Sequence, residues 1–410
     1  MGTNQPKTIP QGYKATALGI IPQEWEVRPL NYLGAICSGG TPDTEVAEYW
    51  NGDIAWCTPS DITKLDTKYI ESTEVKITAK GLKESSATLL PPRSIVVCTR
   101  ATIGNAAICN TEIATNQGFK NIIPNEKTNP EWLYYIIIYS KPRLVRFGCG
   151  STFLEVSKKD FSRFKIAVPP LAEQRKIAEV LGVWDEAIEK QARLIEKLAL
   201  RKRALMQRLL SAKLRLPGFS EPWKIHKLQE LFTERNETNR TDLPLLSITG
   251  DRGVILQTES EKRDTSNDDK SKYKRIAKGD IGYNTMRMWQ GRSALSGLEG
   301  IVSPAYTIVV PNTTDVDGYY MSVLFKQPRL VYDFWTHSQG LVGDTLNCKY
   351  RDFGQVHICC PPLAEQKAIT EVLTAADREI ELAKEKLERL RRQKRGLMQQ
   401  LLTGKKRIKY

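Results

Sequence analysis

The feature that most constrains this chain is a long segment that occurs twice. The first copy begins at Pro169 and reads PPLAEQRKIAEVLGVWDEAIEKQARLIEKLALRKRALMQRLL, and the second begins at Pro361 and reads PPLAEQKAITEVLTAADREIELAKEKLERLRRQKRGLMQQLL. The two copies align without a gap at an offset of 192 residues and are identical at 22 of 42 positions. A period of this length indicates a duplicated domain and not a solenoid of short units. The chain is therefore expected to contain a globular domain followed by a helical segment, twice over.

The repeated segment has the pattern of a long helix. Each copy opens with Pro-Pro and carries a glutamate, Glu173 or Glu365, in the turn that follows, where a negative charge suits the helix dipole. Apolar residues then recur at alternating steps of four and three, which is typical of a coiled coil. They are Ile177, Leu181, Trp184, Ile188, Ile195, Leu198, Leu205 and Leu209, and then Ile369, Leu373, Ala376, Ile380, Leu387, Leu390, Leu397 and Leu401.

We expect these two helices to pair with each other in antiparallel fashion, because each must lead away from its own globular domain. Polar or small residues interrupt both apolar seams at matching places, at Gln191 and Ala383 and again at Lys202 and Lys394. About 40 residues rising 1.5 Å each would form a rod of roughly 60 Å that separates two domains. The alternative is that each segment is an ordinary amphipathic helix packed on its own domain.

Charge indicates a polyanionic partner. The 410 residues carry a formal net charge of +14, and neutralisation of phosphates dominates the binding of nucleic acids. The ends of both repeats are especially basic, with six Lys or Arg and no acid from Arg201 to Arg215, and nine and no acid from Arg389 onward. This charge has two readings of equal standing, because it offsets a helix dipole and also suits contact with nucleic acid or an acidic partner.

Other compositional features exclude several classes of protein. There is no apolar run of about 18 residues that could span a membrane, and the polar N-terminus lacks the apolar core of a secretory signal. We therefore expect a cytoplasmic protein. Eight cysteines are scattered without a C-x-x-C pair and there are only three histidines, so no zinc site is expected and the cysteines are read as buried apolar side chains.

The segments between the repeats have the pattern of mixed α/β domains. Short apolar runs bounded by turn residues, at 95–98, 308–310 and 358–360, predict buried strands. Aromatic-rich stretches at 132–139 and 319–325 predict short core helices. A second, weaker sequence similarity lies at the start of each half, where Trp25 and Leu30 are matched by Trp223 and Leu228.

These motifs resemble the specificity subunits of type I restriction–modification enzymes. The PPLAEQ block is the most specific match, and the openings that contain Tyr13-Lys14, Ile21-Pro22 and Pro217-Gly218-Phe219 also fit. Shorter motifs inside the domains resemble the target-recognition domains of that family. They are Trp56 with Ser60-Asp61, Asn116-Gln117-Gly118, the run from Tyr283 to Gly291, and Ser303-Pro304-Ala305-Tyr306.

The resemblance implies a fold class of mixed α/β (α+β), with two globular target-recognition domains joined by two long antiparallel coiled-coil helices in a pseudo-twofold duplication. We expect an N-terminal tail at 1–14, target-recognition domains at 15–169 and 215–361, helices at 170–214 and 362–404, and a basic tail at 405–410. The family's partners are double-stranded DNA, two modification (methyltransferase) subunits and two restriction subunits. The chain itself would hold no cofactor, because S-adenosylmethionine, ATP and Mg would be bound by those partners.

Candidate DNA-reading residues follow from the chemistry of base edges, since Arg pairs with guanine and Asn or Gln with adenine. In the first domain the candidates are Ser60, Arg100, Thr102, Asn116, Gln117 and Lys120, and Gly104 and Gly118 would allow close approach of the backbone. In the second domain they are Arg287, Trp289, Gln290 and Arg292, while Lys272, Lys274 and Arg275 are assigned to phosphates. Each has a structural alternative: Arg100 could pair with a carboxylate, Trp289 could be core, and Asn116 and Asn284 could form turns.

Catalytic motifs are missing from the sequence. There is no phosphate-binding P-loop, no Asp/Asn-Pro-Pro-Tyr/Phe motif of an adenine methyltransferase and no nuclease constellation after Pro42-Asp43. We therefore expect a non-catalytic recognition subunit. Two alternatives remain open, namely an enzyme with degenerate motifs, and a stand-alone DNA-binding scaffold or regulator that uses its helices to dimerise.

Overall fold

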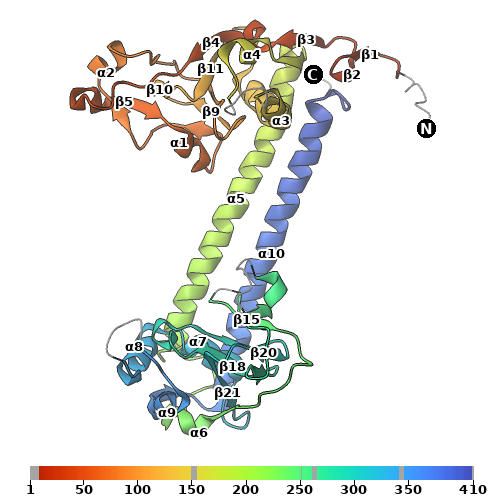
Figure 1. Cartoon of the computed structure of the whole chain (residues 1–410). Coiled ribbons are helices and arrows are strands. Elements are labelled where there is room, and N and C mark those ends of the chain that lie inside the picture. The colour runs from red at the N-terminus through yellow and green to blue at the C-terminus, as the bar shows by residue number, and fades with distance from the viewer. Residues whose placement is uncertain (1–8, 149–154, 251, 261–265, 341–345, 409–410) are drawn as a thin grey trace. The chain divides into compact units, whose positions relative to one another are not determined.

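The computed structural model describes the whole chain except residues 1–8, 149–154, 251, 261–265, 341–345 and 409–410. The chain divides into two compact units, one made of residues 1–194 with 383–410 and the other of residues 195–382. Each unit contains a globular domain, the first part of the long helix that follows it and the last part of the other long helix (Figure 1). Among the described residues no helix is long and apolar enough to cross a membrane.

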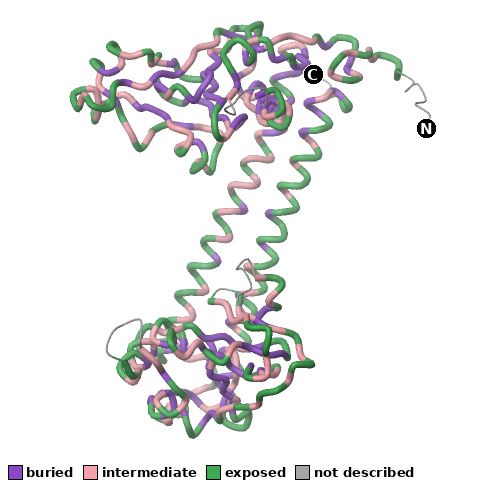
Figure 2. The backbone as a smooth tube through the Cα atoms, in the orientation of Figure 1, coloured by how far each residue is buried: buried purple, intermediate pink, exposed green. Residues whose placement is uncertain are grey.

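The two repeats form the long helices α5 (Leu171–Leu209) and α10 (Leu363–Leu401). Every residue of the two predicted apolar seams is buried or half-buried, and such positions recur along both helices (Figure 2). The Gln191 side-chain amide donates to the carbonyl of Ala383, the equivalent position of the other helix, at 2.9 Å. In one unit Asp185 pairs with Lys394, and in the other Asp377 pairs with Lys202, so the helices run antiparallel. The predicted pairing is confirmed, and the alternative of two independent helices is wrong.

The first globular domain is built around a five-stranded sheet. Its order is β4 (Gly34–Ser38), β11 (Phe119–Pro124), β8 (Ile95–Cys98), β9 (Ala106–Cys109) and β6 (Tyr69–Ile70). Strand β11 pairs with β4 on one side and with β8 on the other, both antiparallel, so it is an interior strand of the sheet. A second sheet contains β10 (Ile113–Thr115), β5 (Trp50–Cys57) and β7 (Lys76–Ile77), of which β10 and β5 are parallel.

Helices and short pairings complete this domain. Two-stranded pairings join β1 (Tyr13–Thr16) to β2 (Gly19–Pro22) and β3 (Glu26–Pro29) to β12 (Lys165–Val168). The helices are α1 (Pro59–Thr63), α2 (Ala79–Lys83), α3 (Pro130–Gly148) and α4 (Lys158–Arg163). The main core packs the buried side of α3 and the start of α5 together with Met398 and Leu401 of α10. The end of α10 is therefore part of the core of the first unit.

The second globular domain repeats the central sheet in a smaller form. Its order is β14 (Phe232–Glu234), β21 (Tyr306–Pro311), β18 (Ile281–Asn284) and β19 (Ser293–Leu295). The other strand pairs are β13 (Lys224–Lys227) with β22 (His357–Cys360), β15 (Leu246–Ile248) with β16 (Val254–Leu256), and β17 (Lys274–Ile276) with β20 (Gly300–Val302). The helices are α6 (Leu228–Leu231), α7 (Gly318–Leu324), α8 (Pro328–His337) and α9 (Tyr350–Gln355).

The two central sheets have the same topology. The order β4-β11-β8-β9 of the first domain corresponds strand by strand to β14-β21-β18-β19 of the second. The strands predicted at 95–98, 308–310 and 358–360 lie in β8, β21 and β22, and the predicted core helices lie in α3 and α7. The duplication therefore extends through domains whose sequences differ widely, and loops at equal places in the two sheets can be compared directly.

One buried carboxylate links each domain to both long helices. In the first unit Glu173 accepts hydrogen bonds from Trp25 Nε1 at 2.8 Å and from Arg407 Nε at 2.7 Å. In the second unit Glu365 accepts from Trp223 Nε1 at 3.3 Å and from Arg215 Nε at 2.6 Å. Arg215 and Arg407 belong to the basic segments at the ends of the repeats, so this part of the charge has a structural role.

Candidate DNA interface

Three loops of the first domain meet at one end of its sheets. Because β5 and β10 are parallel, their carboxyl ends lie together, and the Asn116 amide donates to the Cys57 carbonyl at 3.0 Å. The chain then continues from β5 into α1, which carries the exposed Ser60. The loop between β8 and β9 joins them, since the Thr99 amide and hydroxyl both donate to the Gly118 carbonyl, at 2.8 and 3.1 Å. The structure thus brings the Ser60, Arg100 and Asn116–Gln117 loops together.

Not every candidate in this group is free to contact a ligand. Arg100 and Gln117 are exposed, and Arg100 forms no ion pair with any described carboxylate. Asn116 Oδ1 accepts a hydrogen bond from the Gly118 amide at 2.9 Å, so the alternative role of Asn116 as a turn former is present. Gln117 additionally contacts the Thr41 hydroxyl, a neighbour that sequence reasoning did not single out.

Lys120 and Thr102 face inward. Lys120 is only 6% exposed and its ammonium lies 3.6 Å from the Glu155 carboxylate. Burial lowers the pKa of Lys120, and the neighbouring Glu155 opposes this effect. Thr102 is half-buried. Gly104 has a φ of +81° and packs against Lys141, so its role is in the turn of the loop.

The second domain builds its candidate loop on the same scaffold. The Thr285 amide donates to the Ala305 carbonyl at 3.1 Å, as Thr99 does to Gly118. The amide of Cys348 donates to Thr285 and the amide of Val156 to Thr99, both at 2.9 Å. The β18–β19 loop is therefore the counterpart of the β8–β9 loop, and Ser303–Ala305 is the counterpart of Asn116–Gly118. The two motifs share no residue, so the sequence alone carried no signal of this equivalence.

The β18–β19 loop presents its cations to solvent. Arg287, Gln290 and Arg292 are exposed, and neither arginine forms an ion pair with a described carboxylate. Trp289 is half-buried and its Nε1 donates to the Met286 carbonyl at 3.0 Å, so it shapes the loop without being a core residue. Gly291 has a φ of +70° at the end of the short 3₁₀ turn Met288–Gln290, where a residue with a Cβ would be strained.

The cations assigned to phosphates are held differently from those of the loop. Arg275 donates to Glu237 at 2.7 Å and to Glu299 at 2.5 Å, and Lys274 lies 3.8 Å from Glu234. Hydrogen bonds to these two glutamates raise the pKa of Arg275. Lys272 is exposed. Asn284 Oδ1 accepts from the Met286 amide at 3.0 Å, which is the turn-forming alternative for that residue.

Both loop sets expose arginine and glutamine side chains that can donate hydrogen bonds. Arginine and amide side chains can match base edges or phosphates. Among the described residues no group of three His, Cys, Asp or Glu could hold a metal ion. The two loop sets share a backbone framework but differ in nearly every exposed side chain.

Comparisons with known proteins agree with this arrangement. Residues 22–199 match the family model for a type I restriction modification DNA specificity domain. The chain is 39% identical over 193 residues to the type I restriction enzyme MjaIX specificity subunit of Methanocaldococcus jannaschii, an alignment that covers 46% of this chain and 45% of the relative. The aligned part is thus less than half of that relative's length. The MjaX specificity subunit of the same organism, named as putative, is 25% identical over 97% of both chains.

Solved structures share the fold. A chain from a type I R-M system superposes with a TM-score of 0.61 at 18% identity, covering 94% of this chain and 99% of the other. The HsdS subunit from Thermoanaerobacter tengcongensis gives a TM-score of 0.52 at 17% identity, covering 94% of this chain and 98% of the other. These matches show that residues 22–199 form a type I restriction modification DNA specificity domain and that the chain is similar over nearly its whole length to type I restriction enzyme specificity subunits.

Proposed function

We propose that this chain recognises an interrupted DNA target in two parts and catalyses nothing itself. The observation that carries the proposal is the pair of equivalent loop sets, around Arg100 and around Arg287, on two sheets of one topology. A shared scaffold with different exposed side chains suits two half-sites of different sequence. Base contacts would give the specificity, and cations beside them would hold the phosphates.

The long helices would serve as spacer and docking surface. Each helix carries exposed apolar residues that its partner helix does not cover, among them Val183, Leu200 and Leu382. We propose that two modification subunits dock on the helices and supply S-adenosylmethionine and the methyl transfer. Two restriction subunits, with ATP and Mg, would join them for cleavage. The complex would act in the cytoplasm, where its DNA target is.

The test is a map of modified bases in a methylation-free host that expresses this chain together with the modification subunit from the same genome. The expected result is one new methyladenine motif made of two short parts with a fixed gap. The control is the same modification subunit with another specificity subunit of known target, which shows that the methyltransferase is active. No new motif with this chain, despite that activity, would contradict the proposal and favour a stand-alone DNA-binding scaffold.

A further inference from the structure

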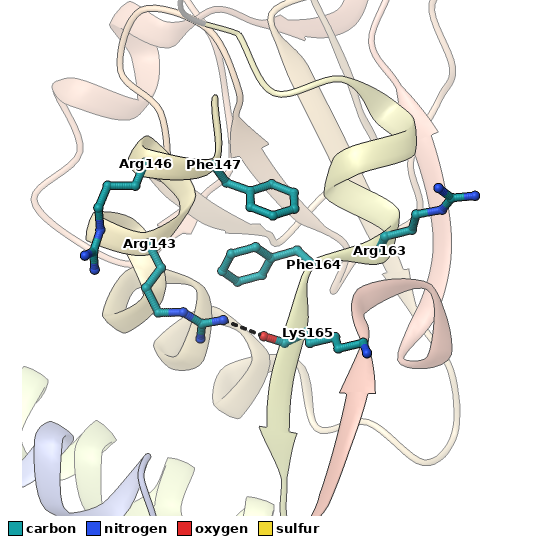
Figure 3. A pocket seen from close by; sticks show the side chains of 6 residues that line it. All are labelled: Arg143, Arg146, Phe147, Arg163, Phe164 and Lys165. Carbon is teal, nitrogen blue, oxygen red and sulfur yellow. Dashed lines mark hydrogen bonds between the residues drawn. The ribbon is translucent and has the colours of Figure 1, made fainter. Parts of the chain in front are cut away.

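A basic groove lies on the first domain outside the loops described above. It has a volume of about 610 Å³ and lies between the carboxyl-terminal part of α3 and the junction of α4 with β12 (Figure 3). Its lining consists of four cations and two phenylalanines, namely Arg143, Arg146, Arg163, Lys165, Phe147 and Phe164. The rings of Phe147 and Phe164 meet edge to face at 5.7 Å, and Phe147 remains 52% exposed.

The charge of this groove is not compensated within the described part of the domain. None of the four cations forms an ion pair with a described carboxylate. Arg143 is fixed in place, because it donates to the Lys165 carbonyl at 2.9 Å and its guanidinium lies 4.7 Å from the centre of the Phe164 ring. Burial, followed by the charge of Arg146, lowers the pKa of Arg143. Arg146 and Arg163 are exposed and point to opposite sides of the phenylalanine pair (Figure 3).

The second domain shows which of these cations the fold requires. Residues 142–145 read Pro-Arg-Leu-Val, and residues 328–331 repeat them at the same place after the sheet. Arg143 thus corresponds to Arg329, which lines a groove of about 410 Å³ together with Asp333 and His357. The Pro-Arg-Leu-Val motif recurs at an offset of 186 residues, which makes Tyr332 the counterpart of Arg146. The offset of 192 residues of the long repeat makes Gln355 and His357 the counterparts of Arg163 and Lys165, and all three counterparts are exposed. The second copy keeps the same strand order in its central sheet without these three cations, so the fold does not need them.

The groove also adjoins the candidate interface. Lys141, on α3, donates to Asn105 Oδ1 of the β8–β9 loop at 2.6 Å. At the end of α3, a Cβ on Gly148 would lie 3.2 Å from Ile103 Cδ1 of the same loop. The loop that carries Arg100 is therefore packed directly against the helix that carries Arg146. A ligand that lies on Arg100 and extends beyond it can reach the groove.

We propose that Arg146, Arg163 and Lys165 bind backbone phosphates of the DNA that flanks the half-site of the first domain, a role that rests on the function proposed above. The cations diverge instead of converging, which suits successive phosphates of a strand and not one small anion. The planar guanidinium of arginine can donate two parallel hydrogen bonds to the oxygens of a phosphate. An acidic surface of a modification subunit is the rival occupant, but two identical subunits docking on two equivalent copies would require the same charges in both.

The test replaces the three cations by the residues that the second copy carries at the same places. The variant Arg146→Tyr/Arg163→Gln/Lys165→His is studied in complex with the modification subunit at pH 8, where the new histidine is neutral. We expect the plot of log affinity against log salt to become shallower by about 2 to 3, since each phosphate contact contributes about 0.9. The change should be equal for target and non-target duplexes, and the methylated motif should stay the same.

A control removes three exposed cations at the ends of β8, β11 and β18 that lie away from the candidate loops. Arg93 precedes β8, Lys127 follows β11 and Lys278 precedes β18, so Arg93→Gln/Lys127→Gln/Lys278→Gln should leave the salt slope unchanged. An unchanged slope in the groove variant would overturn the proposal. An unchanged slope with poorer co-purification of the modification subunit would overturn it in favour of an acidic protein surface. Failure of the unsubstituted complex to prefer any target would instead refute the proposed function.

Discussion

At the scale of single residues, the buried glutamate at the start of each long helix has the same two partners in both copies. Glu173 and Glu365 are each 1% exposed at the side chain, and each is held by an indole and an arginine. Both arginines follow the end of the opposite long helix, so each carboxylate ties three parts of a unit together. Hydrogen bonds to Glu173 and Glu24 raise the pKa of Arg407, so its guanidinium stays charged at any ordinary pH.

The buried cluster of Glu173, Trp25 and Arg407, here called the clasp of the first unit, predicts a large loss of stability for Glu173→Gln. The substitution keeps the shape but removes the charge that compensates Arg407, and breaking a buried pair costs about 3 kcal/mol or more. We expect the free energy of unfolding, measured by urea denaturation, to fall by about that amount. Glu179→Gln breaks an exposed pair with Lys176 and should change the same quantity by less than about 1 kcal/mol. Equal effects of the two substitutions would contradict the role given to the clasp.

The arginines of the second domain predict two different phenotypes. Arg287 is exposed without a described acidic partner, so Arg287→Ala should cost about 1–3 kcal/mol of binding to the target and relax one position of the methylated motif. Arg275 is engaged by Glu237 and Glu299, so Arg275→Gln should lower the melting temperature and leave the motif unchanged. Binding titrations, thermal melts and a base-modification map of both variants separate these outcomes. A relaxed motif in Arg275→Gln alone would reverse the assignment.

Which polar residues are free could not be predicted from the sequence. Lys120 is predicted from the sequence as a DNA contact, and in the fold it is buried beside Glu155, a residue 35 positions away. Arg275 is likewise held by carboxylates from two other segments. By contrast, motifs with local geometry, such as Asn116 with Gly118, could be placed in turns from sequence alone. Side-chain availability depends on tertiary neighbours, which a single sequence does not show.

At the scale of secondary-structure elements, a cluster of Lys, Asp and Tyr joins the long helices to each domain. In the first unit the Tyr135 hydroxyl of α3 donates to Asp185 of α5 at 2.5 Å, and Lys394 of α10 binds the same carboxylate. In the second unit Tyr319 of α7 donates to Asp377 of α10 at 2.6 Å, and Lys202 of α5 binds there at 2.5 Å. The polar interruptions of the apolar seams are thus paired across the helices, which sets their register.

This cluster predicts a local effect of Asp185→Ala on helix α10. The substitution leaves Lys394 and Lys68, whose side chains are 17% and 12% exposed, without a carboxylate partner, which should lower the free energy of unfolding by about 2–3 kcal/mol. Hydrogen exchange should become faster in the part of α10 that belongs to the first unit, residues 383–401. Glu186→Ala removes an exposed neighbour that pairs with Lys190 and serves as the control, with no expected change in exchange.

Heptad spacing predicted these helices well because their contacts repeat regularly along the sequence. All sixteen expected seam residues are at least half-buried, and both helices begin at the residue directly after the Pro-Pro pair. The globular domains were harder to predict, because strands such as β10, with three residues, and β6, with two, are too short to show a period. Their pairing depends on contacts between residues that are far apart in sequence.

At the scale of the whole molecule, the duplication shows which features the two copies share and which differ between them. The helices, their clasps and the strand order are the same in both copies, whereas the exposed loop residues differ. The repeat could therefore be used to predict the architecture and the family. The target sequence could not be predicted, because the two copies have little in common in the β8–β9 and β18–β19 loops, to which we propose to assign base readout.

The spacer role proposed for the helices predicts how the target changes when both are shortened together. Deleting residues 192–198 from α5 and the equivalent 384–390 from α10 removes one heptad from each and keeps the register of the seam. Each helix loses about 10 Å, which corresponds to about three base pairs. A base-modification map should show the same two half-sites with a gap shorter by about that number. Deleting 192–198 alone mismatches the helices and should abolish modification, whereas an unchanged gap in the double deletion would show that the helices do not set the spacing.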